Sequence, residues 1–182
     1  MIENIPTGRL FCRHPDGRVD VLLDQLYFAN GVALASDESW VVVAETGSSR
    51  LNRVWLKGPK AGRAEVFFEN LPGIPDNLST GADGLIWAAL AAPADKALAL
   101  LHRMPYAVRR LAARLPEAVQ PDPQQIVWVM ALDANGHVVH DLRWNSEPYS
   151  MVTGVREYQG HIYMGSLNQE ALLAFELPQA CR

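Results

Sequence analysis

Two similar segments recur in this chain at a fixed distance along the sequence. Residues 28–32 (Phe-Ala-Asn-Gly-Val) are echoed by residues 74–78 (Ile-Pro-Asp-Asn-Leu), and in each an asparagine stands at the start of a short apolar stretch. Each stretch leads through a turn to a second one that carries a tryptophan, Trp40 or Trp87. The two asparagines are 47 residues apart, and so are the two tryptophans. A repeat of this length made of short strands indicates a β-propeller, in which each repeat forms a four-stranded blade.

Strand-like stretches and turn residues divide the chain into four units. Residues 8–24 predict two antiparallel strands around an Asp-Gly turn, the outer half of an incomplete blade. Residues 30–70 and 76–143 each predict a full blade, and residues 150–178 predict a last blade without its outermost strand. We therefore expect an all-β fold, a single partial propeller domain of about three blades with two open flanks.

One segment, residues 94–116, interrupts the strand pattern. Its leucines and other apolar residues recur every three to four positions with arginines between them. This spacing predicts an amphipathic helix, or a pair of helices broken near Pro105, inserted between the second and third strands of the middle full blade.

The composition argues against some classes of partner. Of the 182 residues, 49% are apolar and 20% are charged, and the net charge of −4 is ordinary for a soluble globular domain. The arginines of residues 103–114 suit a solvated helix face at least as well as a phosphate patch, so we expect no nucleic-acid partner. No apolar run approaches the ~20 residues that span a bilayer. The first residues lack the basic and apolar regions of a signal peptide, and the cellular location stays open.

The two cysteines, Cys12 and Cys181, lie near opposite ends of the sequence without metal-ligand spacing. A zinc site is therefore not expected. The pair could form one disulfide between the ends or remain as two free thiols, and the sequence leaves both open.

Four stretches together resemble one known family. Residues 27–34, 43–47, 54–62 and 71–77 are similar to the strictosidine-synthase-like proteins, a family within the paraoxonase and gluconolactonase superfamily, and the later residues 156–167 fit the last blade of the same family. The resemblance runs from about Pro6 to Pro178. It implies a propeller of the six-bladed type, of which this chain resembles the C-terminal half.

The resemblance also implies a metal site. Lactonases of the superfamily hold calcium in the central channel, and their motifs map onto Asn30, Asp76 and Asn77. Amide and carboxylate oxygens suit Ca²⁺, which takes about six to eight oxygen ligands. The further ligands of the family fall outside this chain, so we expect weak binding. An asparagine before a strand can instead bond its own backbone and hold a turn.

Two further positions, Glu45 and Thr153, are candidates for lining the channel. Glu45 follows an apolar strand and either faces the channel or forms an ion pair with Arg50 or Arg53. Thr153 falls at or near the position of the catalytic Glu of strictosidine synthase. Because a hydroxyl cannot perform the proton transfers of that carboxylate, we do not expect the Pictet–Spengler reaction. Trp40, Trp87 and Tyr163 are interpreted as packing between blades.

The other polar residues give no catalytic pattern. The five histidines show no spacing typical of a metal or catalytic pair, and Ser48, Ser49 and Ser166 lack the setting of a nucleophilic serine.

Two hypotheses of function follow. The family implies calcium-assisted hydrolysis of a small-molecule ester or lactone, which would require the other half of the propeller or a partner chain. The alternative is a non-catalytic propeller fragment or interaction module. Two copies could also join at their open flanks and form a ring.

Overall fold

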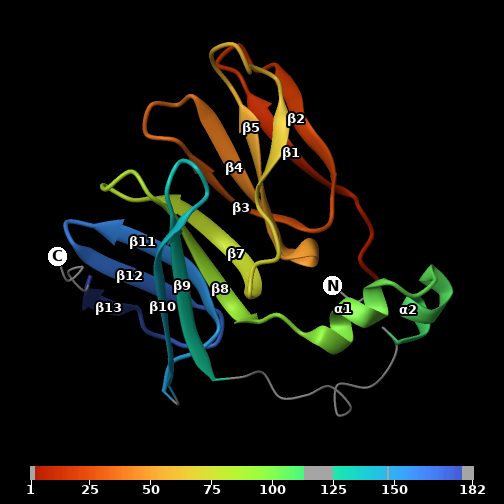
Figure 1. The fold of residues 1–182 in the computed structure, drawn as a ribbon, viewed down its shortest axis with the longest axis vertical. Helices are drawn as coiled ribbons and strands as arrows, with labels where there is room; N and C mark the ends of the chain where they lie inside the picture. Colours follow the sequence, from red (N-terminus) through yellow and green to blue (C-terminus); the bar gives the residue numbers. More distant parts are fainter. Residues whose placement is uncertain (1–2, 113–124, 147, 178–182) are drawn as a thin grey trace.

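The computed structural model describes residues 3–112, 125–146 and 148–177 (Figure 1). Within them, thirteen strands form four antiparallel sheets, which confirms the expected all-β class. The half-blade contains β1 (Gly8–Arg13) and β2 (Val19–Leu26), and the first full blade contains β3 (Ala29–Leu34), β4 (Trp40–Glu45), β5 (Arg50–Trp55) and β6 (Ala64–Phe68). The second full blade contains β7 (Gly73–Thr80), β8 (Ile86–Pro93), β9 (Ile126–Leu132) and β10 (Val138–Asn145), and the last blade contains β11 (Val152–Tyr158), β12 (His161–Ser166) and β13 (Leu173–Glu176).

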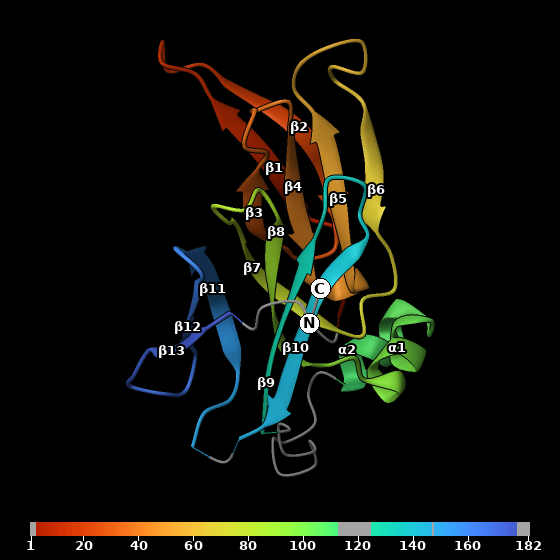
Figure 2. The ribbon, with the colours of Figure 1, turned by 60° about the vertical axis from the view of Figure 1, so that its left-hand side comes forward.

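Among the residues that the structure describes, three short helices lie in connections between strands. The 3₁₀ helix η1 (Thr46–Ser48) joins β4 to β5, and α1 (Lys96–His102) and α2 (Tyr106–Ala112) lie between β8 and β9. The predicted helical insertion is thus confirmed up to residue 112, and residues 113–116 of that prediction lie outside the described residues. Figures 1 and 2 show α1 and α2 at the same end of the molecule as η1. No helix in the described part of the chain is long and apolar enough to cross a membrane.

The second strands of both full blades are buried on both faces. All six residues of β4 are buried, as are the first six of β8, because each of these strands lies between two neighbouring sheets. This arrangement explains their continuous apolar runs, since a strand with one solvated face would alternate between apolar and polar residues. Fully burying one such aliphatic side chain contributes about 1.5–3 kcal/mol to the stability of the folded state. Packing between blades therefore supplies most of the core.

The first strands of the three consecutive blades, β3, β7 and β11, lie side by side (Figure 1). Hydroxyl groups on β7 donate hydrogen bonds to both neighbouring strands. The Thr80 Oγ1 hydroxyl donates to the Leu34 carbonyl on β3 at 2.6 Å, and Ser79 Oγ donates to the Val155 carbonyl on β11 at 2.7 Å. These bonds satisfy backbone carbonyls that β3 and β11 turn towards a neighbouring blade rather than towards their own sheet.

Gly31 allows β3 to approach β7 closely. A Cβ atom at this position would lie 2.3 Å from the Leu78 backbone nitrogen and 2.5 Å from the Asp76 carbonyl oxygen. Both neighbours are backbone atoms and cannot rotate away. Gly31 is therefore required for close contact between the two blades.

The three equivalent aromatic residues have different surroundings. Trp40 and Trp87 are 6% and 0% exposed, each packed in the core between its own blade and the next, as predicted. Tyr163 is 41% exposed, so the prediction that it packs between blades is wrong in this chain. In the part of the chain that the structure describes, no other sheet packs on this face of the last blade.

The cysteine pairing stays a prediction. Cys12 is half-buried on β1 as a free thiol, and Cys181 lies outside the described residues.

We predict that Gly31→Ala destabilises the fold by about 1–3 kcal/mol, the usual cost of overpacking a rigid site. The melting temperature should fall by roughly 2–4 °C for each kcal/mol. Gly154→Ala on β11 is the matched control, because the nearest atom to its added Cβ would be 3.9 Å away. Equal melting temperatures for the two variants would contradict the close-approach role of Gly31.

Candidate metal site and adjoining cleft

The structure brings Asn30 and Asp76 together across the contact between β3 and β7. Both side chains are half-buried, and the Asn30 side chain is hydrogen-bonded to the Asp76 carboxylate. Burial raises the pKa of Asp76 above its ordinary value of 3.8, and the hydrogen bond from Asn30 only partly offsets this effect. A half-buried carboxylate whose charged form is disfavoured gains from a cation beside it.

Asn77, the third predicted ligand, faces the last blade. Its side chain is exposed, and the Nδ2 group donates to the Thr153 carbonyl oxygen on β11 at 2.6 Å. Asn77 therefore joins two blades, a role that the sequence analysis did not consider. Thr153 takes part through its backbone, and its side chain is half-buried. The role of Asn77 as a metal ligand stays a prediction.

Glu45 lies in an ion pair, one of the two interpretations that the sequence allowed. Its side chain is fully buried, and it accepts hydrogen bonds from Arg50 Nε at 2.5 Å, Asn52 Nδ2 at 2.7 Å and the Tyr27 backbone N–H at 2.9 Å. Burial alone would raise the pKa of Glu45, but these bonds outweigh burial and lower the pKa. The ion pair and the hydrogen bonds of Glu45 thus stabilise its buried negative charge.

The donor set fits calcium in chemistry but not in number. Asn30, Asp76 and Asn77 together offer about four side-chain oxygens, whereas Ca²⁺ takes about six to eight. In the described part of the chain, no three His, Cys, Asp or Glu side chains are grouped so as to hold a metal ion. These residues therefore fit part of a site for a hard cation. The remaining oxygen ligands would have to come from other residues or from another chain.

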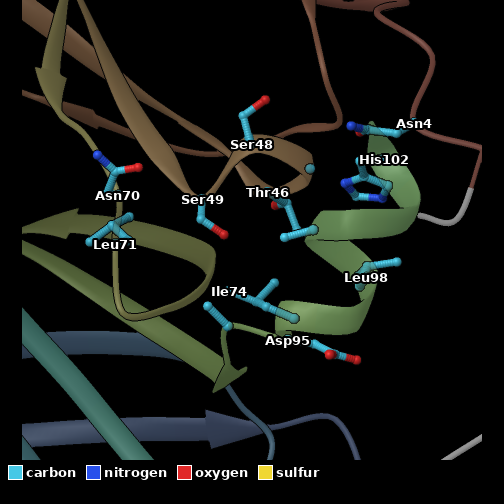
Figure 3. Close-up of a pocket in the computed structure, with 13 residues that line it drawn as sticks. Asn4, Thr46, Ser48, Ser49, Asn70, Leu71, Ile74, Asp95, Leu98 and His102 are labelled. Carbon is cyan, nitrogen blue, oxygen red and sulfur yellow. The ribbon is translucent and has the colours of Figure 1, made fainter. Parts of the chain in front are cut away.

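A cleft of about 410 Å³ opens beside this site (Figure 3). It is bordered by η1, the start of β7 and helix α1. Asn30, Asp76 and Asn77 do not line this cleft. It is linked to them through β7, because Thr46 Oγ1 donates to the Pro75 carbonyl at 2.7 Å and Asp76 follows Pro75 in the chain. The lining residues are Asn4, Thr46, Gly47, Ser48, Ser49, Asn70, Leu71, Ile74, Ala94, Asp95, Leu98, Ala99 and His102.

The cleft gathers polar residues to which sequence reasoning gave no role. Ser48 and Ser49 come from the β4–β5 connection, and His102 comes from the inserted helix α1 (Figure 3). Ser48 Oγ donates to the Glu45 carboxylate at 3.1 Å, so this hydroxyl is engaged with the buried ion pair. More than fifty positions separate the serines from His102 in the sequence, and no local pattern signals that they share a cleft.

We predict that Asp76→Asn stabilises the calcium-free protein near neutral pH. The raised pKa means that the folded state disfavours the carboxylate, so Asp76 costs stability at pH values above both its unfolded and folded pKa. The melting temperature of the variant should exceed that of the unmodified chain at pH 7. The difference should shrink as the pH falls towards 3.8, the ordinary value of the group.

Asp24→Asn provides the control for this comparison, because it removes an exposed carboxylate on β2. If it stabilised the protein as much as Asp76→Asn does, general charge would explain the effect and the burial of Asp76 would not.

Comparison with known proteins shows a consistent set of relatives. Residues 1–59 match the family model described as strictosidine synthase. The chain is 37% identical to the adipocyte plasma membrane-associated protein hemomucin of Drosophila melanogaster, over 96% of the chain and 36% of that protein. It is 34% identical to the human adipocyte plasma membrane-associated protein, over 97% of the chain and 44% of that protein. It is 30% identical to strictosidine synthase-like 6 of Arabidopsis thaliana, over 97% of the chain and 47% of that protein.

Solved structures share the fold. A calcium-binding regucalcin from Agrobacterium tumefaciens superimposes with a TM-score of 0.58 at 17% identity, over 92% of this chain and 47% of that one. A gluconolactonase from Xanthomonas campestris gives a TM-score of 0.59 at 16% identity, over 93% of this chain and 44% of that one. These neighbours are six-bladed propellers. The chain belongs to the strictosidine synthase-like family of β-propeller proteins, and it spans less than half the length of the relatives named here.

Proposed function

We propose that this chain forms part of a calcium-assisted hydrolase of small esters or lactones. The observation that carries the proposal is the half-buried carboxylate of Asp76, which is bonded to Asn30 and follows Pro75, a residue hydrogen-bonded to the Thr46 side chain of the cleft. Two solved neighbours lend support through their descriptions, one as a calcium-binding protein and the other as a gluconolactonase.

The roles of the residues follow from their chemistry. Asp76 and Asn30 would hold the cation, with Asn77 as a third candidate ligand. A bound cation supplies Lewis-acid polarisation of the ester carbonyl and stabilises the oxyanion that forms on attack by water. Leu71, Ile74 and Leu98 give the cleft an apolar wall for the carbon skeleton of a substrate. Ser49 and Asn70 place a hydroxyl and an amide at the same cleft, where they could bond polar groups of the substrate.

The Pictet–Spengler condensation is not part of the proposal. That reaction needs a carboxylate to move protons between amine and aldehyde, and the corresponding position carries the Thr153 hydroxyl. Its backbone carbonyl is already bonded to Asn77. The family name therefore does not extend to this chemistry here.

A non-catalytic role is the second candidate. It is favoured by the limited share of each relative that the chain spans and by the short supply of oxygen ligands. In that case Asn30, Asp76 and Asn77 would serve contact between the blades alone.

We expect calcium to raise the melting temperature of the chain at millimolar concentration, because a cation beside Asp76 offsets the cost of burying its charge. Asp76→Asn should lose this shift and Asp24→Asn should keep it. Thermal melting with and without a chelator measures both. An equal shift in all three proteins would remove Asn30 and Asp76 from the ligand list.

Turnover is measured separately with an aryl ester and a lactone as substrates. Hydrolysis that disappears with chelator supports the enzyme. A calcium-dependent shift in melting temperature without hydrolysis of either substrate would favour the non-catalytic candidate.

A further inference from the structure

The outer face of the last blade exposes aromatic side chains to solvent. Tyr163 occupies the position in its blade that Trp40 and Trp87 occupy in theirs, and those two residues are 6% and 0% exposed. Tyr163 is 41% exposed and its neighbour Tyr158 is 52% exposed. The residues that alternate with them, Ile162 and Met164, are buried against the second full blade. One face of this sheet is thus packed, and the opposite face presents two tyrosine rings to solvent, with the exposed Arg156 directly opposite Tyr163 and the exposed His161 opposite Tyr158.

The opposite end of the chain shows the complementary surface. On β7 and β11, Leu78 and Val155 point towards the preceding blade, and each is 7% exposed. On β3, Val32 and Leu34 point in the corresponding direction and are 46% and 42% exposed. Their cross-strand partners Val43 and Val41 are covered by the half-blade, so the uncovered area is limited to the innermost strand.

The half-blade occupies the outer part of a blade position. Leu10 and Leu26 pack over β4 and β5, and β1 touches β3 only marginally, as the third strand β9 touches β11. In the complete pair of neighbours, the first and second strands β7 and β8 pack along β11 instead. Strands β1 and β2 therefore correspond to the third and fourth strands of a blade. The positions of the first and second strands, over Val32 and Leu34, are not filled by the described residues.

We propose that a second copy of this chain fills that space and that two copies close one ring. The last blade of the partner supplies a first and a second strand, β11 and β12, which place Tyr158 and Tyr163 over Val32 and Leu34. The half-blade supplies the third and fourth strands of the same composite blade. In this arrangement β13 must leave the third position, where it pairs with β12 and packs Leu173 and Phe175 against the core. It has only four residues, and none of them is fully buried.

This arrangement gives the number of blades that a closed ring needs. Each copy contributes two full blades, and each junction between copies forms one composite blade. Two copies related by a two-fold axis therefore give six blades, the number in the solved neighbours. The contact is isologous, since each copy offers both the exposed tyrosines and the exposed aliphatic residues.

The assembly also doubles the candidate metal site, and this step rests on the proposed function. Two pairs of Asn30 and Asp76 would line one channel from opposite sides. About eight side-chain oxygens would then be available from both copies of Asn30, Asp76 and Asn77, which matches the number that Ca²⁺ takes.

The test is the mass of the unmodified chain in solution, measured by size-exclusion chromatography with light scattering at micromolar concentrations. We expect twice the 20.1 kDa of one chain. Val32→Glu should shift the mass to that of a single chain, because it places a charge under the tyrosines of the partner. The fold should tolerate it, since this side chain is 46% exposed within one chain.

Val138→Glu is the matched control. Val138 is 44% exposed on β10, and its cross-strand partner Leu132 belongs to the core between the two full blades of the same chain. This variant should remain a dimer. Tyr163→Glu tests the opposite side of the junction and should give a single-chain mass, even if Val32→Glu does not fold.

A single-chain mass for the unmodified protein would overturn the proposal and leave the two flanks to a further part of a longer polypeptide. A dimer that persists in both Val32→Glu and Tyr163→Glu would overturn the junction. Calorimetric titration distinguishes the metal step. One calcium ion for every two chains supports it, whereas a dimer that binds no calcium confirms the ring and contradicts the proposed function.

Discussion

The contact between β3 and β7 is the interaction on which the rest of this structure depends. Gly31 has no side chain, so the backbones of two blades approach more closely than any other residue would allow. That approach brings the Thr80 hydroxyl to the Leu34 carbonyl and the Asn30 amide to the Asp76 carboxylate. The position of the second blade against the first and the candidate metal site both depend on this contact.

One buried and one half-buried carboxylate show how the fold treats charge. Glu45 is surrounded by Arg50, Asn52 and a backbone N–H, and its pKa is lowered despite full burial. Asp76 receives a hydrogen bond from Asn30, and its pKa is raised. The first arrangement is complete within the chain and stabilises the ionised form. The second disfavours its own charge, so a cation beside Asp76 would stabilise the ionised form, which is the role proposed for this carboxylate.

Local sequence signals predicted the strands well, because each is set by neighbouring residues. Asp16-Gly17 forms the hairpin turn through the left-handed conformation of Gly17 and a hydrogen bond from the Arg18 backbone N–H to the Asp16 carboxylate. The apolar run of β4 indicated burial on both faces, and all six of its residues are buried. The 47-residue repeat also placed Asn30 and Asn77 at equivalent positions of neighbouring blades. It is Asp76, the residue before Asn77, that meets Asn30 in the structure.

Contacts between distant segments were beyond that reasoning. Asn77 bonds the Thr153 carbonyl, a partner 76 positions away, and the cleft joins Ser49 to His102 across the inserted helix. Tyr163 carries the same pattern as Trp40 and Trp87, yet its exposure is decided by whether a blade follows. The sequence by itself determined the secondary structure, the repeat and the ligand chemistry, because residue type and spacing specify these locally. Only the tertiary structure decided which polar groups meet and which apolar faces stay open, because both depend on how closely whole sheets can pack.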